Sequence, residues 1–173
     1  MGIRHNAREW AVQFLFQTEF NREDVKLDKA LELFWNFQDQ LASMDPADSM
    51  EIPADGKSLS KARVFAEELI RGVISKHREI DGLIEKFAAN WDVERIGTVE
   101  RNVMRLAIYE MLYRTDIPPV VSINEAVDLA KAFSSTESGK FVNGILDRIR
   151  ADIKRDARKV DNPRPAPPSL PLP

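Results

Sequence analysis

Apolar residues recur at intervals of three and four along almost the whole chain, and this spacing constrains the fold more than any other feature. Such spacing places apolar side chains on one face of a helix with 3.6 residues per turn. No alternating apolar and polar run bounded by turn residues offers a convincing strand. A chain of 173 residues can bury about two-thirds of its unfolded surface as one domain. The sequence therefore predicts an all-α protein, a compact helical bundle.

The boundaries of the helices follow from caps and prolines. The periodic segments predict helices over residues 4–18, 28–42, 60–75, 79–89 and 99–114. We expect Thr98 to cap the fifth of these helices and the Pro118-Pro119 pair to follow its end. Two capping boxes, Ser122 with Glu125 and Ser134 with Glu137, predict where the last two helices begin.

Two segments lack the helical spacing. Residues 43–58 combine two prolines, a glycine and acidic residues, which is typical of a solvated connecting loop. Residues 91–96 are expected to form a short turn. The last helix is expected to end near Arg158, because the sequence that follows is rich in proline. We therefore predict one helical domain over 1–158 and a disordered, proline-rich tail over 159–173.

The sequence contains few of the residues that catalysis requires. It has no cysteine and only two histidines, His5 and His77, neither of which belongs to a recognisable nucleophilic triad. No ligand set with zinc spacing and no glycine-rich phosphate loop is present. The sequence thus predicts no metal, no cofactor and no enzyme activity. The absence of cysteine is compatible with the cytoplasm, and no stretch has the length of a membrane span.

Charge is unevenly distributed along the chain. The formal net charge is −3, but residues 23–58 hold nine acids and only three bases. The first 22 residues and the segment 117–173 both carry a small excess of bases. Local basic areas at the two ends of the sequence could therefore meet a polyanion in spite of the acidic total.

The first predicted helix has two faces. One carries the apolar residues Ile3, Ala7, Trp10, Ala11 and Phe14. The other combines charge with aromatic and aliphatic side chains: Arg4, His5, Arg8, Val12, Leu15 and Phe16. Arginine grips phosphate and an exposed ring stacks on an unpaired base, so this second face is a candidate RNA surface. Alternatively, its apolar members pack against another helix and its arginines are surface residues.

A family resemblance favours the RNA interpretation. Residues 122–147 read S-I-N-E-A-V-D-L-A-K-A-F-S-S-T-E-S-G-K-F-V-N-G-I-L-D. The segments Ile123 to Lys131 and Lys140 to Asp147 resemble the signature of the NusB family of bacterial transcription antitermination factors. The central R-L-A-I-Y-E run and the arginine-containing first helix are also similar to that family. The resemblance covers most of residues 3–153 and is weakest through 20–60.

The resemblance implies two helical subdomains and a non-catalytic adaptor in transcription antitermination. Such proteins bind the single-stranded boxA element of ribosomal RNA transcripts together with ribosomal protein NusE, and they act on RNA polymerase. The RNA-binding residues that we expect are Arg4, His5, Arg8, Phe16, Lys140 and Phe141. The residues that we expect to face the protein partner are Phe87, Glu100 and Arg101.

Other assignments remain open at the level of sequence. Phe141 can equally belong to a core stripe with Ile145 and Ile149. Arg105 and Glu110 lie on apolar turns, so we expect them to form structural ion pairs rather than RNA contacts. One alternative function is that of the NusB-like domain found in some ribosomal RNA cytosine methyltransferases. Another is a protein-interaction module that does not bind RNA.

Overall fold

The computed structural model describes residues 2–20, 25–44, 55–90 and 96–161, and every regular element in these ranges is an α-helix. The helices are α1 (Ile3–Phe20), α2 (Leu27–Met44), α3 (Gly56–Phe87), α4 (Thr98–Tyr113), α5 (Pro119–Phe133) and α6 (Thr136–Asp161). The described part of the chain contains no strand. The prediction of an all-α protein is therefore confirmed.

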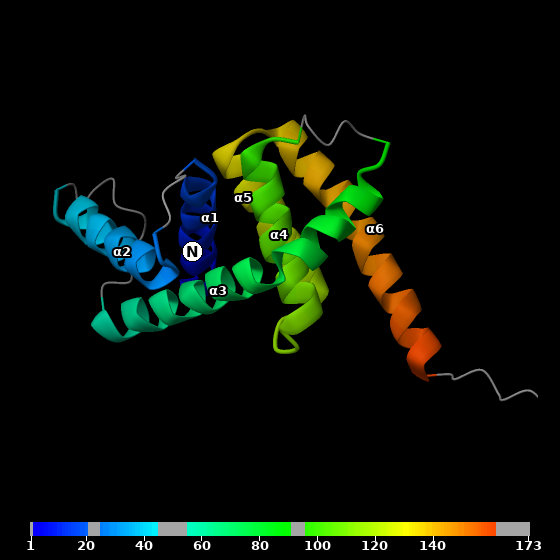
Figure 1. The fold of residues 1–173 in the computed structure, drawn as a ribbon, viewed down its shortest axis with the longest axis horizontal. Coiled ribbons are helices and arrows are strands. Elements are labelled where there is room, and N and C mark those ends of the chain that lie inside the picture. The colour runs from blue at the N-terminus through cyan, green and yellow to red at the C-terminus, as the bar shows by residue number, and fades with distance from the viewer. Residues whose placement is uncertain (1, 21–24, 45–54, 91–95, 162–173) are drawn as a thin grey trace, which may run out of the picture.

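The helices form two groups that α3 connects (Figure 1). In the first group α1 packs on α3, and in the second α5 packs on both α4 and α6. The long helix α3 runs under α1 and continues to α4, so it contributes to both groups. At its crossing with α4, a Cβ on Gly72 would lie 2.0 Å from the Tyr109 ring. Glycine at this position allows the two helices to approach closely.

The core continues through both groups. In the first, Trp10 meets Trp35 and Phe14 meets Phe34, each pair edge to face with ring centroids 5.4 Å apart. Aromatic pairs in this arrangement contribute stability beyond the area that they bury. In the second group the largest fully buried apolar side chains are aliphatic or contain sulfur: Met104, Ile108, Leu129, Ile145, Leu146 and Ile149.

Two predicted helices are in fact one. We expected a break between residues 75 and 79, but α3 is continuous through this segment. Val73 and Ile80 are both buried and lie seven residues apart, which keeps the apolar stripe on one face of the helix. The polar residues between them lie on its exposed face. A short polar interval is thus compatible with an uninterrupted helix.

The three predicted N-caps were wrong. The N-cap of α4 is Gly97, and Thr98 is the first helical residue. Helix α5 begins at Pro119, so Ser122 lies inside the helix and its side chain is buried. At α6 the hydroxyl of Ser135, rather than that of Ser134, accepts a hydrogen bond from the backbone N–H of Ser138 at 3.1 Å. A hydroxyl three residues before a glutamate therefore did not locate either helix start.

Other expectations fall at the edges of the described ranges. The predicted loop over 43–58 is wrong at its two ends, because α2 continues to Met44 and α3 begins at Gly56. The remainder of that loop over 45–54 lies outside the described residues, as do residues 91–95 of the predicted turn. Helix α6 extends three residues beyond the predicted end at Arg158. The tail from residue 162 onward also lies outside the described residues.

Candidate nucleic-acid interface

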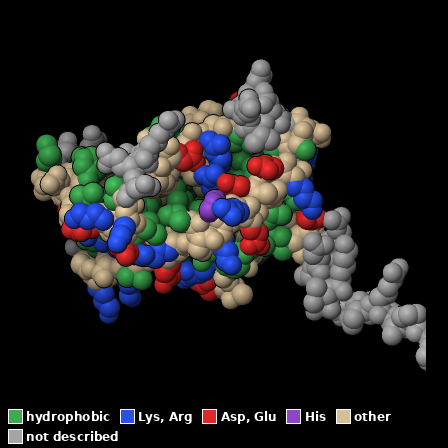
Figure 2. Space-filling view, viewed as in Figure 1, with side chains coloured by type: hydrophobic (Ala, Val, Ile, Leu, Met, Phe, Trp, Pro, Cys, Tyr) green, Lys and Arg blue, Asp and Glu red, His purple; other side chains and the backbone are tan. Residues whose placement is uncertain are grey.

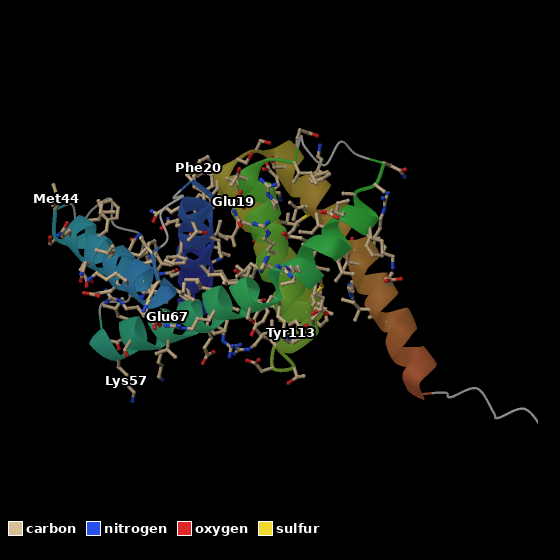
Figure 3. The ribbon with its side chains drawn as sticks, in the orientation of Figure 1. Glu19, Phe20, Met44, Lys57, Glu67 and Tyr113 are labelled. Atoms are coloured by element: carbon tan, nitrogen blue, oxygen red, sulfur yellow. The ribbon has the colours of Figure 1, made fainter. Side chains whose placement is uncertain are left out.

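Helices α1 and α4 run antiparallel, and the predicted site residues are divided between the two ends of this pair. At one end Arg4 pairs with Asp116, and at the other Arg101 pairs with Glu19. Arg4 and Phe16 are separated along the α1 axis by about 18 Å, since a helix rises 1.5 Å per residue. Figure 3 places Glu19 at the upper end of α1 and Tyr113 at the lower end of α4.

We call the first region the arginine end; it comprises Arg4, His5, Arg8, Arg114 and Asp116. We call the second the phenylalanine end; it comprises Phe16 and Phe20 of α1 with the first turns of α4. The first turn of α6 reaches the first turn of α4 through the hydroxyl of Ser138, which donates to Glu100 at 2.5 Å. The six predicted RNA residues therefore do not form one cluster.

Arg8 is buried at the centre of a charged network. Its side chain is 4% exposed and that of Glu110 is 1% exposed. The Nε of Arg8 donates to Oε1 of Glu110 at 2.7 Å, and Nη2 donates to Oε2 at 3.3 Å. The hydroxyl of Ser122 donates to the same Oε2 at 2.5 Å. Arg8 thus joins α1 to α4 and α5 and presents almost no surface to a ligand.

His5 extends this network towards the surface. Its Nδ1 lies 2.7 Å from Oε2 of Glu125, and its Nε2 lies 3.6 Å from Oε1 of Glu9. The side chain of His5 is only 9% exposed. Partial burial raises the pKa of Glu9, while His5 acts in the opposite direction. The second face that we expected α1 to offer to RNA is therefore largely enclosed by α4 and α5.

Arg4 remains accessible, with 53% of its side chain exposed. Its guanidinium carbon lies 5.0 Å from the centroid of the Phe65 ring. The guanidinium carbon of Arg114 lies 5.1 Å from the same centroid. Both arginines bind the carboxylate of Asp116, whose own side chain is 44% exposed. Phe65 and Asp116 were not singled out by the sequence, because nothing local connects them to Arg4.

The phenylalanine end presents aromatic rings rather than arginines. Phe16 is 37% exposed and Phe20 is 64% exposed, and their ring centroids lie 5.0 Å apart. An exposed ring of this kind can stack on an unpaired base. Phe16, which was predicted to bind RNA, is thus exposed enough for its ring to meet a base. Phe20 extends that aromatic surface.

Arg105 of α4 lies in a polar network with Glu19, the residue before Phe20 on α1. It makes a bidentate pair with Asp81, with N···O distances of 2.7 and 2.9 Å, and contacts Glu19 at 2.5 Å. Arg101 contacts the other oxygen of Glu19 at 3.2 Å. The expectation that Arg105 and Glu110 form structural ion pairs is confirmed. The partner of Glu110 is Arg8, which we had expected to contact RNA.

Lys140 and Phe141 lie beside a hollow of about 830 Å³ between the starts of α4 and α6. Lys140 has 69% of its side chain exposed and pairs with Glu137 at 2.8 Å. Phe141 is half-buried and packs against the core. The opposite wall of the hollow includes Glu100 and Gly97. A cation and an aromatic ring therefore border a space of the size typical of ligand pockets.

Glu100 is held in place by two hydroxyl groups. Ser134 and Ser138 donate to its Oε1 at 2.8 and 2.5 Å. Partial burial acts to raise the pKa of Glu100, but these hydrogen bonds outweigh it, and the pKa is lowered. Glu100 thus contributes a fixed negative charge to the hollow. Phe87, the other expected partner residue, is half-buried at the end of α3, with the Lys86 ammonium 5.0 Å from its ring centroid.

Positive and negative side chains alternate on the face drawn in Figure 2, and no broad area carries one sign. Among the described residues, no group of three or more His, Asp or Glu side chains is arranged to hold a metal ion. None of the helices in the described ranges has the length and apolar content needed to cross a membrane. The candidate RNA interface is thus made of separate cations and aromatic rings and not of one large basic surface.

Comparison with known proteins gives consistent matches. The NusB family model matches residues 5–151. The transcription antitermination protein NusB of Myxococcus xanthus is 41% identical over 155 residues, covering 90% of this chain and 99% of that protein. The structure of T. maritima NusB has a TM-score of 0.63 and 38% identity, covering 86% of this chain and 91% of the other. A crystal structure of antitermination factors NusB and NusE in complex with dsRNA has a TM-score of 0.65 and 26% identity. The match covers 87% of this chain and 97% of the other.

Fold and site together define a helical binding protein whose described polar clusters are ion pairs rather than catalytic groups. The chain belongs to the NusB family. Members of this family are transcription antitermination factors and not enzymes, which decides between the adaptor and the enzyme that the sequence left open. The match covers nearly all of the M. xanthus protein. That relative therefore contains no additional methyltransferase domain.

Proposed function

We propose that this protein is a cytoplasmic, RNA-binding adaptor in bacterial transcription antitermination. It binds boxA-type single-stranded RNA of ribosomal RNA transcripts together with ribosomal protein NusE, within an RNA polymerase antitermination complex. Its family membership supports this assignment. The similar structure in which NusB and NusE are bound to dsRNA supports a joint surface for RNA and protein.

The observation that carries the proposal is the placement of Lys140 and Phe141 beside a hollow of about 830 Å³. Lysine supplies a mobile charge for phosphate, and the adjacent ring supplies a surface for a base. Phe16 adds a second ring and Arg4 a second accessible cation. Arg4 and Phe16 lie near opposite ends of α1, whereas Lys140 and Phe141 lie on α6 beside the start of α4.

His5 and Arg8 have an indirect role in this proposal. Both side chains are buried against carboxylates of α4 and α5, so they fix the position of α1 instead of meeting phosphate. On the protein side, Glu100, Arg101 and Phe87 form the surface for NusE. Glu100 and Arg101 are adjacent on the first turn of α4, and hydrogen bonds or ion pairs restrain both side chains. Such restraint lowers the entropy that an interface must remove.

The test is a salt series. Substituting Arg4 and Lys140 together by alanine removes two accessible cations, and each lost phosphate contact makes the slope of log K against log salt shallower by about 0.7 on a single strand. We expect weaker binding of a boxA-like RNA, measured by fluorescence anisotropy with and without NusE. Lys57→Ala is the control, since Lys57 is an exposed cation at the start of α3, outside both ends.

The outcomes separate two functions. Equal affinity and equal slope for the double variant and the control would mean that these cations do not bind RNA. If the unaltered protein bound NusE but not RNA, the alternative of a protein-interaction module would replace the adaptor.

A further inference from the structure

Two arginines from different helices converge on one carboxylate at the arginine end. Asp116 follows α4, and its Oδ2 accepts from Nη2 of Arg4 at 3.0 Å. Arg114 donates to the same group through Nε at 2.9 Å and Nη2 at 3.2 Å. Both guanidinium groups lie about 5 Å from the Phe65 centroid, at 5.0 and 5.1 Å. The carboxylate is thus held in a fork made by two cations beside a ring.

This geometry resembles a site for an external anion. A guanidinium presents planar donors that match carboxylate and phosphate oxygens in the same way. Phe65 is buried, and its ring contacts both guanidinium groups. Glu68 binds Nη1 of Arg114 at 2.7 Å and so holds that guanidinium in place from its other edge. The donors are therefore oriented before any ligand arrives.

The site is also accessible. The side chains of Arg4 and Asp116 are 53% and 44% exposed. The hydrogen bond from Arg114 is the main reason that the pKa of Asp116 falls to about 2, so the carboxylate is charged at neutral pH. Solvent-exposed ion pairs contribute little net stability, because the pairing is offset by side-chain entropy and screened by salt. The exposed pair between Arg4 and Asp116 therefore offers little resistance to a polyanion, whereas Arg114 is 20% exposed and is the less accessible half of the site.

We propose that Arg4 and Arg114 form a clamp for a backbone phosphate of RNA, and that Asp116 occupies this clamp in the free protein. Asp116 then acts as an internal competitor that lowers RNA affinity. The proposal rests on the RNA-binding function proposed above. It adds a phosphate site that includes Arg114, which the sequence did not predict, and a residue whose removal increases binding.

Asp116→Asn is the informative variant, because it removes the competing charge and retains the shape of the side chain. We expect RNA affinity at low salt to rise by about threefold or more, with little change in the salt slope, because the clamp binds the same phosphate in both proteins. Fluorescence anisotropy with a boxA-like single strand and NusE measures both. A gain in affinity cannot result from partial unfolding, which circular dichroism would detect separately.

The matched control is Asp28→Asn. Asp28 pairs with Arg71 at 2.6 Å on an exposed surface, so this variant also removes one carboxylate from an arginine and changes the net charge by the same amount. A second variant combines Asp116→Asn with Arg114→Gln. We expect no gain from Asp28→Asn and loss of the gain in the combined variant.

Three results would overturn the clamp: no gain for Asp116→Asn, an equal gain for Asp28→Asn, or a gain that persists without Arg114. Each leaves the proposed function intact if the unaltered protein binds RNA. Failure of the unaltered protein to bind RNA with NusE present would instead overturn the proposed function, and the clamp with it.

Discussion

The two ends of α1 carry different kinds of binding group. At the arginine end every predicted cation has a carboxylate partner: Asp116 for Arg4, Glu125 for His5 and Glu110 for Arg8. At the phenylalanine end, the rings of Phe16 and Phe20 are partly free. RNA must therefore replace or rearrange ion pairs at one end, whereas at the other it can stack without breaking any contact.

This difference concerns the physical origin of affinity. Phosphate binding by arginine or lysine releases counterions, so it weakens as salt increases. Stacking on a ring depends little on salt. The two ends should consequently be distinguishable by the salt slope, and the buried part of the arginine end should be distinguishable from both by protein stability.

The largest expected effect is on stability, from Arg8→Ala. This substitution leaves Glu110 buried without its cation, and breaking a buried pair costs about 3–5 kcal/mol. The free energy of unfolding, from denaturant titration followed by circular dichroism, should fall by that amount. Asp28→Asn, which removes an exposed partner of Arg71, should leave it nearly unchanged.

The distinction between the two ends of α1 would be wrong if the Arg8→Ala protein kept its full free energy of unfolding and lost RNA binding. Arg8 would then be an RNA contact, and its burial against Glu110 would describe only the free protein. Arg8→Lys sharpens the test, because lysine keeps the charge but cannot make the two N–H···O bonds that the guanidinium makes.

The helical nature of the chain could be predicted because it depends on local spacing. The spacing also placed Trp10 and Phe14 correctly in the core. Spacing alone is less informative on α2, where Phe37 and Leu41 follow the same apolar periodicity but are 50% and 45% exposed. These residues continue the apolar face of the helix beyond the part that α1 and α3 cover, and periodicity alone does not tell how wide the covered part is.

The candidate site was less predictable, because its decisive contacts join distant parts of the sequence. Arg8 and Glu110 are 102 residues apart, and no local feature of α1 indicates that Arg8 is enclosed. Ser122 has the spacing of a capping box with Glu125, yet its hydroxyl serves Glu110. The sequence identified which groups carry charge. Whether a charge is neutralised depends on helix packing.

The second prediction concerns the phenylalanine end. Phe16→Ala should weaken RNA binding by about 1–3 kcal/mol, the range for loss of one stacked base, without changing the salt slope. Fluorescence anisotropy over a salt series measures both quantities. Phe37→Ala is the matched control, since Phe37 is 50% exposed on α2 and outside both ends. An equal loss in the two variants, or a shallower slope for Phe16→Ala, would contradict stacking at this end.

The smallest expected effect comes from Glu9, beside His5. Burial raises the pKa of Glu9 above its ordinary value of 4.5, so folding favours the protonated carboxyl. The stability that this group contributes is complete at pH values below 4.5 and is lost as pH rises through the raised pKa. At neutral pH, Glu9→Gln should therefore increase the melting temperature slightly. The increase should disappear below pH 4.5, and Glu32→Gln on the exposed face of α2 should produce no comparable change. A melting temperature that instead falls at neutral pH would mean that the ion pair with His5 outweighs burial, and that the arginine end depends on its outer carboxylates for stability as well as on Glu110.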